Sequence, residues 1–286
     1  MNIKITTVGV VLASALLLDS AWATGDASHI KQHELSHQHM QASEYKSIKE
    51  ATKALEMTGL ALKQLDEHKT DEALKTLALV TGQLEVIVAQ YPNLALAPID
   101  SQVAVLDYQG NKNTVEAIRK SAVDLLEDGH LQEARLLMKD IASEIVISTR
   151  KLPLATYPDV ITSVVPMIQK GKLREAKMAL EQALSTVVVT QNIIPLPVLR
   201  ASTALSNAQK LANKDKRDAQ ANTSLKSLLH EAKRQLEWAE ILGYGNKEAY
   251  QPLYQTIQDI EKKTSDGSHE QGLFDKLKEK IKALVA

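Results

Sequence analysis

One stretch of the sequence, from Ala122 to Leu196, contains the same pattern twice. Leu131-Gln-Glu-Ala134 is followed 42 residues later by Leu173-Arg-Glu-Ala176. Each copy has an apolar helical pattern, a glycine, a second helical pattern, a β-branched run and a proline. This order predicts a repeated helical hairpin. Because one hairpin cannot bury its own apolar face, the copies should stack. The expected fold is therefore all-α, built from stacked antiparallel helical hairpins with an internal repeat of about 42 residues.

A degenerate copy precedes this pair. Glu72-Ala73 lies 20 residues before Pro92, and Glu133-Ala134 lies equally far before Pro153. His68 occupies the place of the glycine, which suits the left-handed turn that ends a helix. The surplus of residues after Pro92 predicts an insertion around 93–113. A fourth copy, near 211–219, lacks both the glycine and the proline and is left open.

Short strands are the alternative to helices in three places, 103–107, 144–149 and 186–191. Their β-branched residues favour strands. Residues 131–150, however, form one continuous apolar face, and for this reason we favour helices that run up to the prolines. Pro166 lies inside a helical pattern and should kink or break that helix.

The first 23 residues have the features of a secretory signal peptide. A short basic start precedes an apolar core that ends at Ala21-Trp-Ala23, and this core is shorter than the roughly 20 residues that span a bilayer. We expect cleavage after Ala23 and export of the mature chain. Export of a chain without cysteine fits a bacterial periplasm. The formal net charge of -1 gives no reason to expect nucleic acid as a partner.

The mature chain is predicted to have three parts: a histidine-rich N-terminal arm at 24–44, a helical repeat domain at 45–245, and C-terminal helices at 246–286 with a linker at 264–270. The last segment places Leu273, Leu277, Ile281 and Leu284 on one face and lysines mostly opposite. A basic amphipathic helix can lie on a membrane surface. We favour docking of this helix on the core or on a partner subunit.

The arm contains the candidate metal ligands His29, His33, His37 and His39. Zinc or another transition metal could bind there, and four imidazoles would also gain charge in acid. His33-Glu-Leu-Ser-His37 matches the H-E-x-x-H pattern of zinc hydrolases. The motif begins ten residues after the predicted cleavage site, without a preceding sheet edge and without the third histidine of the extended pattern. A zinc hydrolase is therefore the most distant of the functions considered.

Elsewhere the sequence contains no phosphate loop, nucleophile elbow or paired-carboxylate signature. Glu133 and Glu175 stand in the first turns of predicted helices, where carboxylates are structural. His68, His130 and His230 are assigned to turns and helix ends. We therefore predict that the protein is not an enzyme and that it has no cofactor.

Several strings of the chain resemble the YfdX family of bacterial periplasmic proteins over about residues 45–243. They are Leu94-Ala-Leu-Ala-Pro-Ile-Asp100, Leu126-Glu-Asp-Gly-His-Leu-Gln-Glu-Ala134, Ser143-Glu-Ile-Val-Ile-Ser148, Leu152-Pro-Leu-Ala-Thr-Tyr-Pro158 and Ile194-Pro-Leu-Pro197. The resemblance implies a mostly helical, homo-oligomer-forming protein linked to acid, heat or drug stress, with chaperone-like binding of other proteins. It carries no site residues. We expect the Leu-Pro-Leu and Ile-Pro-Leu strings, with the insertion, to form the contact surface.

The expected function is therefore non-enzymatic, chaperone-like protection in the periplasm through binding of unfolded or partner proteins. The alternative is a metal- or pH-responsive binding protein that uses the arm.

Overall fold

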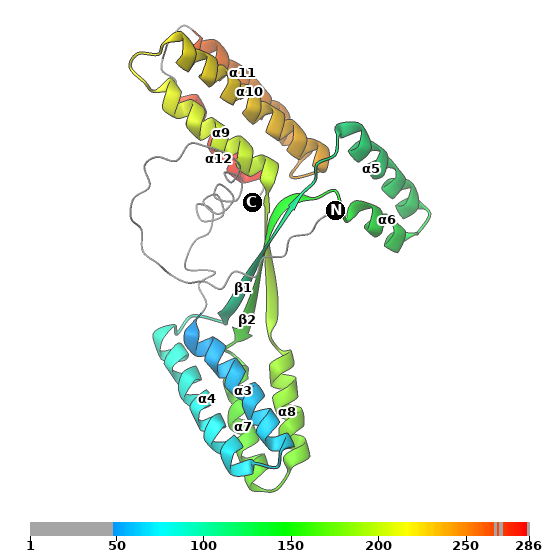
Figure 1. The fold of residues 1–286 in the computed structure, drawn as a ribbon, viewed down its shortest axis with the longest axis vertical. Coiled ribbons are helices and arrows are strands. Elements are labelled where there is room, and N and C mark those ends of the chain that lie inside the picture. Colours follow the sequence, from blue (N-terminus) through cyan, green and yellow to red (C-terminus); the bar gives the residue numbers. More distant parts are fainter. Residues whose placement is uncertain (1–47, 266–267, 269–270, 285–286) are drawn as a thin grey trace, which may run out of the picture. The chain divides into compact units, whose positions relative to one another are not determined.

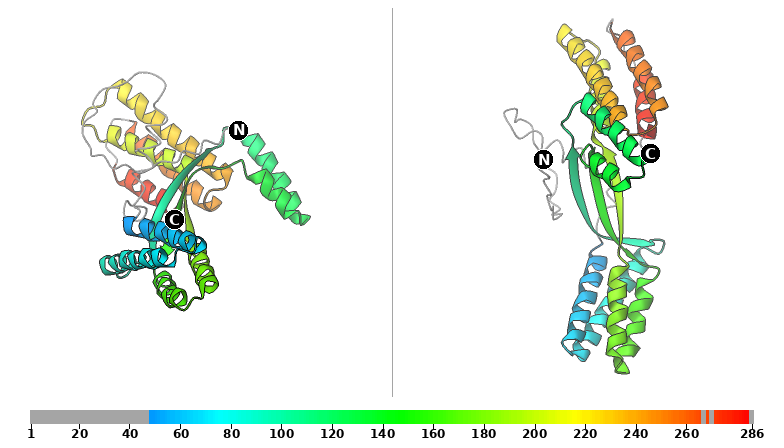
Figure 2. Two further views of the ribbon diagram at one scale, coloured as in Figure 1. Left: turned by 60° about the horizontal axis from the view of Figure 1, so that its bottom comes forward. Right: turned by 90° about the vertical axis from the view of Figure 1, so that its right-hand side faces the viewer.

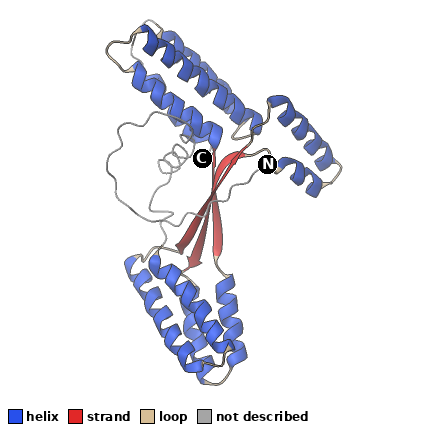
Figure 3. Ribbon diagram, viewed as in Figure 1, coloured by secondary structure: helices blue, strands red, loops and turns tan. Residues whose placement is uncertain are grey.

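The computed structural model describes residues 48–265, 268 and 271–284. Helices dominate this part of the chain and three strands accompany them, which confirms the mostly helical fold class (Figures 1 and 3). The elements in chain order are α3 (Lys49–Asp66), α4 (Thr70–Gln90), β1 (Leu96–Asp107), α5 (Lys112–Glu127), α6 (Leu131–Met138), β2 (Ser143–Pro153), α7 (Tyr157–Gln169), α8 (Leu173–Ser185), β3 (Val188–Pro195), α9 (Leu196–Ala212), α10 (Ala219–Leu242), the 3-10 helix η1 (Lys247–Ala249), α11 (Tyr250–Thr264) and α12 (Gly272–Leu284).

The order helix, helix, strand occurs three times between residues 49 and 195. The two helices of each pair meet at a residue with positive φ: His68 at 60°, Gly129 at 80° and Gly171 at 73°. The hydrogen bonds around these residues are also alike. The amide after each one donates to a carbonyl five residues earlier, at 2.8 to 2.9 Å. This is the Schellman arrangement, which satisfies carbonyls at a helix end. The 42-residue sequence repeat itself stays a prediction.

The favoured extension of helices up to the prolines is wrong. Helix α6 ends at Met138 and β2 begins five residues later, and β3 likewise follows α8. The three strands form a sheet in the order β1-β2-β3. The Tyr108 amide donates to the Ala142 carbonyl and the Leu154 amide to the Ala95 carbonyl, so β1 and β2 are antiparallel. Residues of β2 alternate between buried and half-buried from Ser143 to Thr149, and the β-branched run supplies this alternation.

The prolines also occupy places that the sequence did not predict. Pro153 and Pro195 end strands, whereas Pro92 follows α4 and precedes β1. The surplus residues of the first copy therefore lie largely in α4, which has 21 residues where α6 has 8. Helix α7 continues through Pro166 to Gln169, so the predicted break is absent from this helix. The fourth copy would lie in α9 and α10, which are followed by η1 rather than by a strand.

The chain forms two compact units. Unit 1 contains residues 104–146 and 193 onward, and unit 2 contains 48–103 and 147–192. In unit 2, α3 packs on α4 and on α8, and α4 packs on α7. Figure 2 shows these four helices side by side. Their shared core includes Leu65, Leu77, Ile87, Ile161 and Leu180. The boundaries predicted at 45–245 and 246–286 stay predictions.

Unit 1 has a core of its own between α9, α10, α11 and α12. Helix α12 buries Phe274, Leu277, Ile281 and Leu284 in this core, so its apolar face docks within the protomer. Leu273, which the sequence assigned to that face, is only partly buried. Among the described residues, no helix is long and apolar enough to cross a membrane.

Candidate functional site

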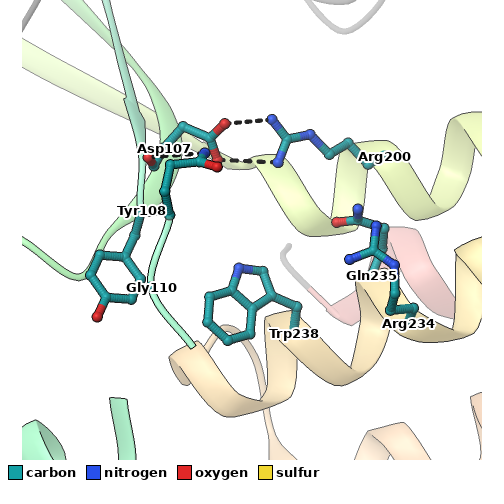
Figure 4. A pocket seen from close by; sticks show the side chains of 8 residues that line it. Asp107, Tyr108, Gly110, Arg200, Arg234, Gln235 and Trp238 are labelled. Carbon is teal, nitrogen blue, oxygen red and sulfur yellow. Dashed lines mark hydrogen bonds and ion pairs between the residues drawn. The ribbon is translucent and has the colours of Figure 1, made fainter. Parts of the chain in front are cut away.

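A cavity of about 420 Å³ lies in unit 1 where β1 ends (Figure 4). Strand β1 and the residues that follow it supply one wall, and α9 and α10 supply the other. The side chains that define it are Asp107, Tyr108, Arg200, Arg234, Gln235 and Trp238.

A bidentate ion pair joins the two walls of the cavity. Asp107 is the last residue of β1, and Arg200 lies near the start of α9, which follows directly on the proline that ends β3. Arg200 donates from both terminal nitrogens to the two carboxylate oxygens of Asp107, at 3.1 and 2.8 Å. Both side chains are partly buried. This geometry is stronger and more directional than a single charged contact.

Two aromatic rings also line the cavity. Tyr108 and Trp238 stack with centroids 6.2 Å apart and planes 9° from parallel. A Cβ atom at Gly110 would collide with the Tyr108 ring, so a larger residue there would require this ring to move. The Tyr108 amide donates to the Ser143 hydroxyl at 3.0 Å, which fixes the chain beside β2.

One buried acceptor in the cavity has no partner. Arg234 donates twice to Glu231, at 2.9 and 2.6 Å, and the Gln235 amide nitrogen donates to the same carboxylate at 2.8 Å. Burial raises the pKa of Glu231, but these hydrogen bonds outweigh it and hold the pKa below its usual range. The Gln235 oxygen is buried without a hydrogen bond, and Figure 4 shows it directed between Arg200 and Trp238. The cavity thus offers a hydrogen-bond acceptor beside an aromatic pair. This arrangement suits the binding of a ligand.

Tyr244 fixes the end of α10 to the start of β2. Gly243 caps α10 in the left-handed conformation, and Tyr244 follows it. The Tyr244 hydroxyl accepts from the Ser143 amide and donates to Glu144, each at 2.9 Å. Burial first, and then the bond to Glu144, raise the pKa of Tyr244 far above its ordinary value. This residue is structural and stays neutral.

A second candidate site is an exposed apolar surface on the α5–α6 hairpin. It consists of six large side chains, which we call the hairpin surface: Val123, Leu126, Leu131, Leu136, Leu137 and Met138. Helix α6 buries only Ala134, and α5 buries only Val115 and Ala122. These three residues belong to neither of the two large cores. Exposed apolar side chains gathered on one hairpin favour a protein-binding surface.

The predicted site residues meet different outcomes. His29, His33, His37 and His39 lie outside the described residues, as do the predicted signal peptide and the HELSH motif. In the described part of the chain, no group of three or more metal-binding side chains comes together. His130 lies 3.0 Å from Glu133, and His230 lies 3.5 Å from Glu261. These are surface pairs of small energetic weight.

The contact surface expected at the Leu-Pro-Leu and Ile-Pro-Leu strings and the insertion stays a prediction, although the leucines of these strings lie inside the fold. Leu152, Leu154 and Leu196 are buried, because the turns around them belong to the ends of strands rather than to exposed loops between hairpins. No local pattern predicts the cavity, since Asp107 and Arg200 are 93 residues apart. The sequence indicates the hairpin surface only weakly, through the apolar residues that surround most of the circumference of α6.

Comparisons with known proteins point to one family. A family model described as YfdX protein matches residues 54–193. Among solved structures, the chain is similar to YfdX of Salmonella Typhi, with 15% sequence identity and a TM-score of 0.38, over 52% of this chain and 93% of that one. A search of curated proteins found no match.

Proposed function

Since the chain belongs to the YfdX family, we propose that it is a non-enzymatic stress-response protein that protects other proteins by binding their exposed apolar segments. We further propose that it acts in the periplasm, to which the predicted signal peptide would direct it. Unfolding under acid or heat exposes apolar groups. The free energy falls when a second apolar surface covers these groups.

The observation that carries this proposal is the hairpin surface. Leu131 and Leu136 are each 61% exposed on a helix of only eight residues. Burying an exposed leucine side chain contributes about 1.5–3 kcal/mol, so a few such contacts suffice for reversible binding. The surface contains no cysteine. Binding there would be non-covalent and tolerant of sequence.

The test is light scattering of a heat-unfolded model substrate with and without the mature protein, at about pH 7 and about pH 5. We expect the wild type to suppress aggregation. A variant with Leu131→Ser, Leu136→Ser and Leu137→Ser should lose this protection while keeping its helical content. Leu79→Ser is the matched control, because Leu79 is also well exposed but lies on α4. Equal aggregation with and without wild-type protein would refute the proposal.

The alternative function, a metal- or proton-responsive arm at His29, His33, His37 and His39, stays a prediction. Zinc titration calorimetry of the mature protein tests it, and the absence of heat would remove the metal half.

A further inference from the structure

The cavity of unit 1 contains a buried acceptor that the fold orients and leaves unpaired. Gln235 is 5% exposed, and its side-chain oxygen has no hydrogen-bond partner among the described residues. Because the Glu231 carboxylate only accepts hydrogen bonds, the amide nitrogen must face it, and the oxygen takes the other side. Figure 4 shows this oxygen directed between Arg200 and Trp238. A buried acceptor without a partner lowers stability, so a ligand that brings a donor gains affinity.

The charges that line the cavity are already balanced. Arg200 donates to both carboxylate oxygens of Asp107. Arg234 donates twice to Glu231. A cation would therefore lie beside two guanidinium groups without a free carboxylate, and an anion would meet the unpaired oxygen of Gln235. The ligand that fits these groups is neutral and carries at least one hydrogen-bond donor.

Unused N–H groups surround the acceptor. Within the described residues, Arg200 and Arg234 each use two of their five N–H groups in these pairs, so further donors remain for a ligand. The indole nitrogen of Trp238 lies on the side of its ring that faces Asp107 and Arg200 (Figure 4). The cavity thus presents several donors around one buried acceptor. A hydroxyl group donates once and accepts twice, so a ligand with neighbouring hydroxyls satisfies both kinds of group.

The aromatic pair and the size of the cavity narrow the class of ligand. The rings of Tyr108 and Trp238 are nearly parallel with centroids 6.2 Å apart, whereas a third aromatic ring between them would need about 7–8 Å. The two rings therefore offer their outer surface, on which the apolar C–H face of a sugar ring can pack. A volume of about 420 Å³ lies in the lower part of the range of about 300–1,000 Å³ for small-molecule sites. One or two sugar rings suit this volume.

The acceptor becomes reachable when one neighbouring side chain turns aside. The Gln235 oxygen has almost no contact with solvent in the free protein. Trp238 lies three positions after Gln235 on α10, and therefore on the same face of the helix. Its half-buried ring can rotate away from the oxygen as a ligand enters. The fluorescence of this tryptophan should then report the binding.

We propose that the cavity binds a neutral mono- or disaccharide. One hydroxyl donates to the Gln235 oxygen, neighbouring hydroxyls accept from the guanidinium groups, and one face of the sugar packs on the aromatic pair. The cavity shares no residue with the hairpin surface. The inference therefore goes beyond the proposed function and does not depend on it.

The first measurement is the fluorescence of Trp238 during titration with glucose, N-acetylglucosamine, maltose and trehalose to about 50 mM. Trp238 is the single tryptophan after the predicted cleavage at Ala23, so the signal comes from the cavity. We expect a saturable change with at least one sugar, with a Kd of about 1 mM or below, and matching heat in calorimetry. Uracil, a neutral heterocycle with an amide edge, should not compete.

The second measurement links the ligand to one atom of the cavity. Gln235→Met removes the acceptor at similar volume, and the Kd should rise about five- to tenfold. Gln209→Met is the matched control, because this side chain also makes hydrogen bonds but lies outside the cavity. Deoxy analogues of the best sugar complete the cycle. The analogue without the donating hydroxyl should bind wild type about five- to tenfold more weakly than the parent sugar, and bind Gln235→Met equally well.

Several results would overturn the sugar site. Absence of saturable binding across the panel would do so, and so would binding of uracil without binding of any sugar. Equal loss of affinity in Gln235→Met and Gln209→Met would contradict the role of the buried oxygen. Circular dichroism verifies the folding of both variants, and the deoxy series on wild type decides the matter if Gln235→Met does not fold: no analogue weaker than the parent would refute the site. The proposed function fails separately, through unchanged substrate aggregation.

Discussion

Substitutions at the three left-handed turns test whether His68 lowers the stability of the first hairpin by occupying a position that favours glycine. His68 has a φ of 60° and an exposed side chain, whereas Gly171 has a φ of 73° in the second hairpin of the same unit. We expect His68→Gly to stabilise unit 2 and Gly171→Ala to destabilise it by a similar amount. Gly129→Ala should act in the same direction on unit 1.

The magnitude follows from two opposing terms. A residue with a Cβ loses about 1–2 kcal/mol in the left-handed region. A glycine lowers the stability by about 0.5–1 kcal/mol, because it makes the unfolded chain more flexible. A Cβ at Gly171 or Gly129 meets no atom within 4 Å, so no collision adds to these terms. The net effect is about 0.5–1 kcal/mol, positive for His68→Gly and negative for the two alanine variants.

Urea unfolding followed by circular dichroism measures these changes. With a slope of about 2 kcal/mol/M, the midpoint should shift by about 0.3–0.5 M. Each unit has its own core, so Gly129→Ala should shift a different part of the curve from the other two variants. A loss of stability in His68→Gly would refute the reasoning, because it would require a contact of the imidazole that outweighs the backbone strain.

Three further predictions concern the cavity and the two cores. In a double-mutant cycle of Asp107→Asn and Arg200→Met, thermal unfolding should give a coupling of about 1–2 kcal/mol, and additivity would contradict the bidentate pair. Phe274→Ala should destabilise unit 1 by about 3–5 kcal/mol in urea, because the ring is fully buried; a smaller effect would argue against docking of α12. Burial raises the pKa of Tyr157 to about 12, so the unfolded chain, with a tyrosine pKa near 10, loses its proton first. Tyr157 should therefore contribute a fall in stability of roughly 2 kcal/mol between about pH 10 and 12, and Tyr157→Phe should remove this contribution in alkaline unfolding titrations, while Tyr244, whose pKa is also raised, keeps its own.

The sequence predicted local features well where one residue type has one strong physical preference. Gly129 and Gly171 end helices, and His68 takes the same turn despite its Cβ. The docking side of α12 was predicted because Leu277, Ile281 and Leu284 recur at helical spacing. Such patterns depend only on neighbours within a few turns.

Features that depend on distant residues were missed. Residues 131–150 have an apolar face that fits a helix, yet the chain changes to a strand after Met138 because Ile145 and Ile147 are buried in the sheet. That sheet requires β1, more than 30 residues earlier. The cavity depends on the meeting of Asp107 with Arg200, which no local pattern encodes. The hairpin surface also lay hidden, because an apolar residue in a helix is ordinarily assigned to a core.

The boundary between the two units falls inside each of the three strands, at 103/104, 146/147 and 192/193. The chain therefore crosses from one unit to the other three times, and neither unit is a continuous segment. During synthesis, unit 2 has all of its residues once residue 192 has emerged, whereas unit 1 must wait for α12. Domains generally fold in the order in which they are completed. In the interval, residues 104–146 have already been made while the rest of their unit has not, and the exposed leucines of α6 belong to that segment.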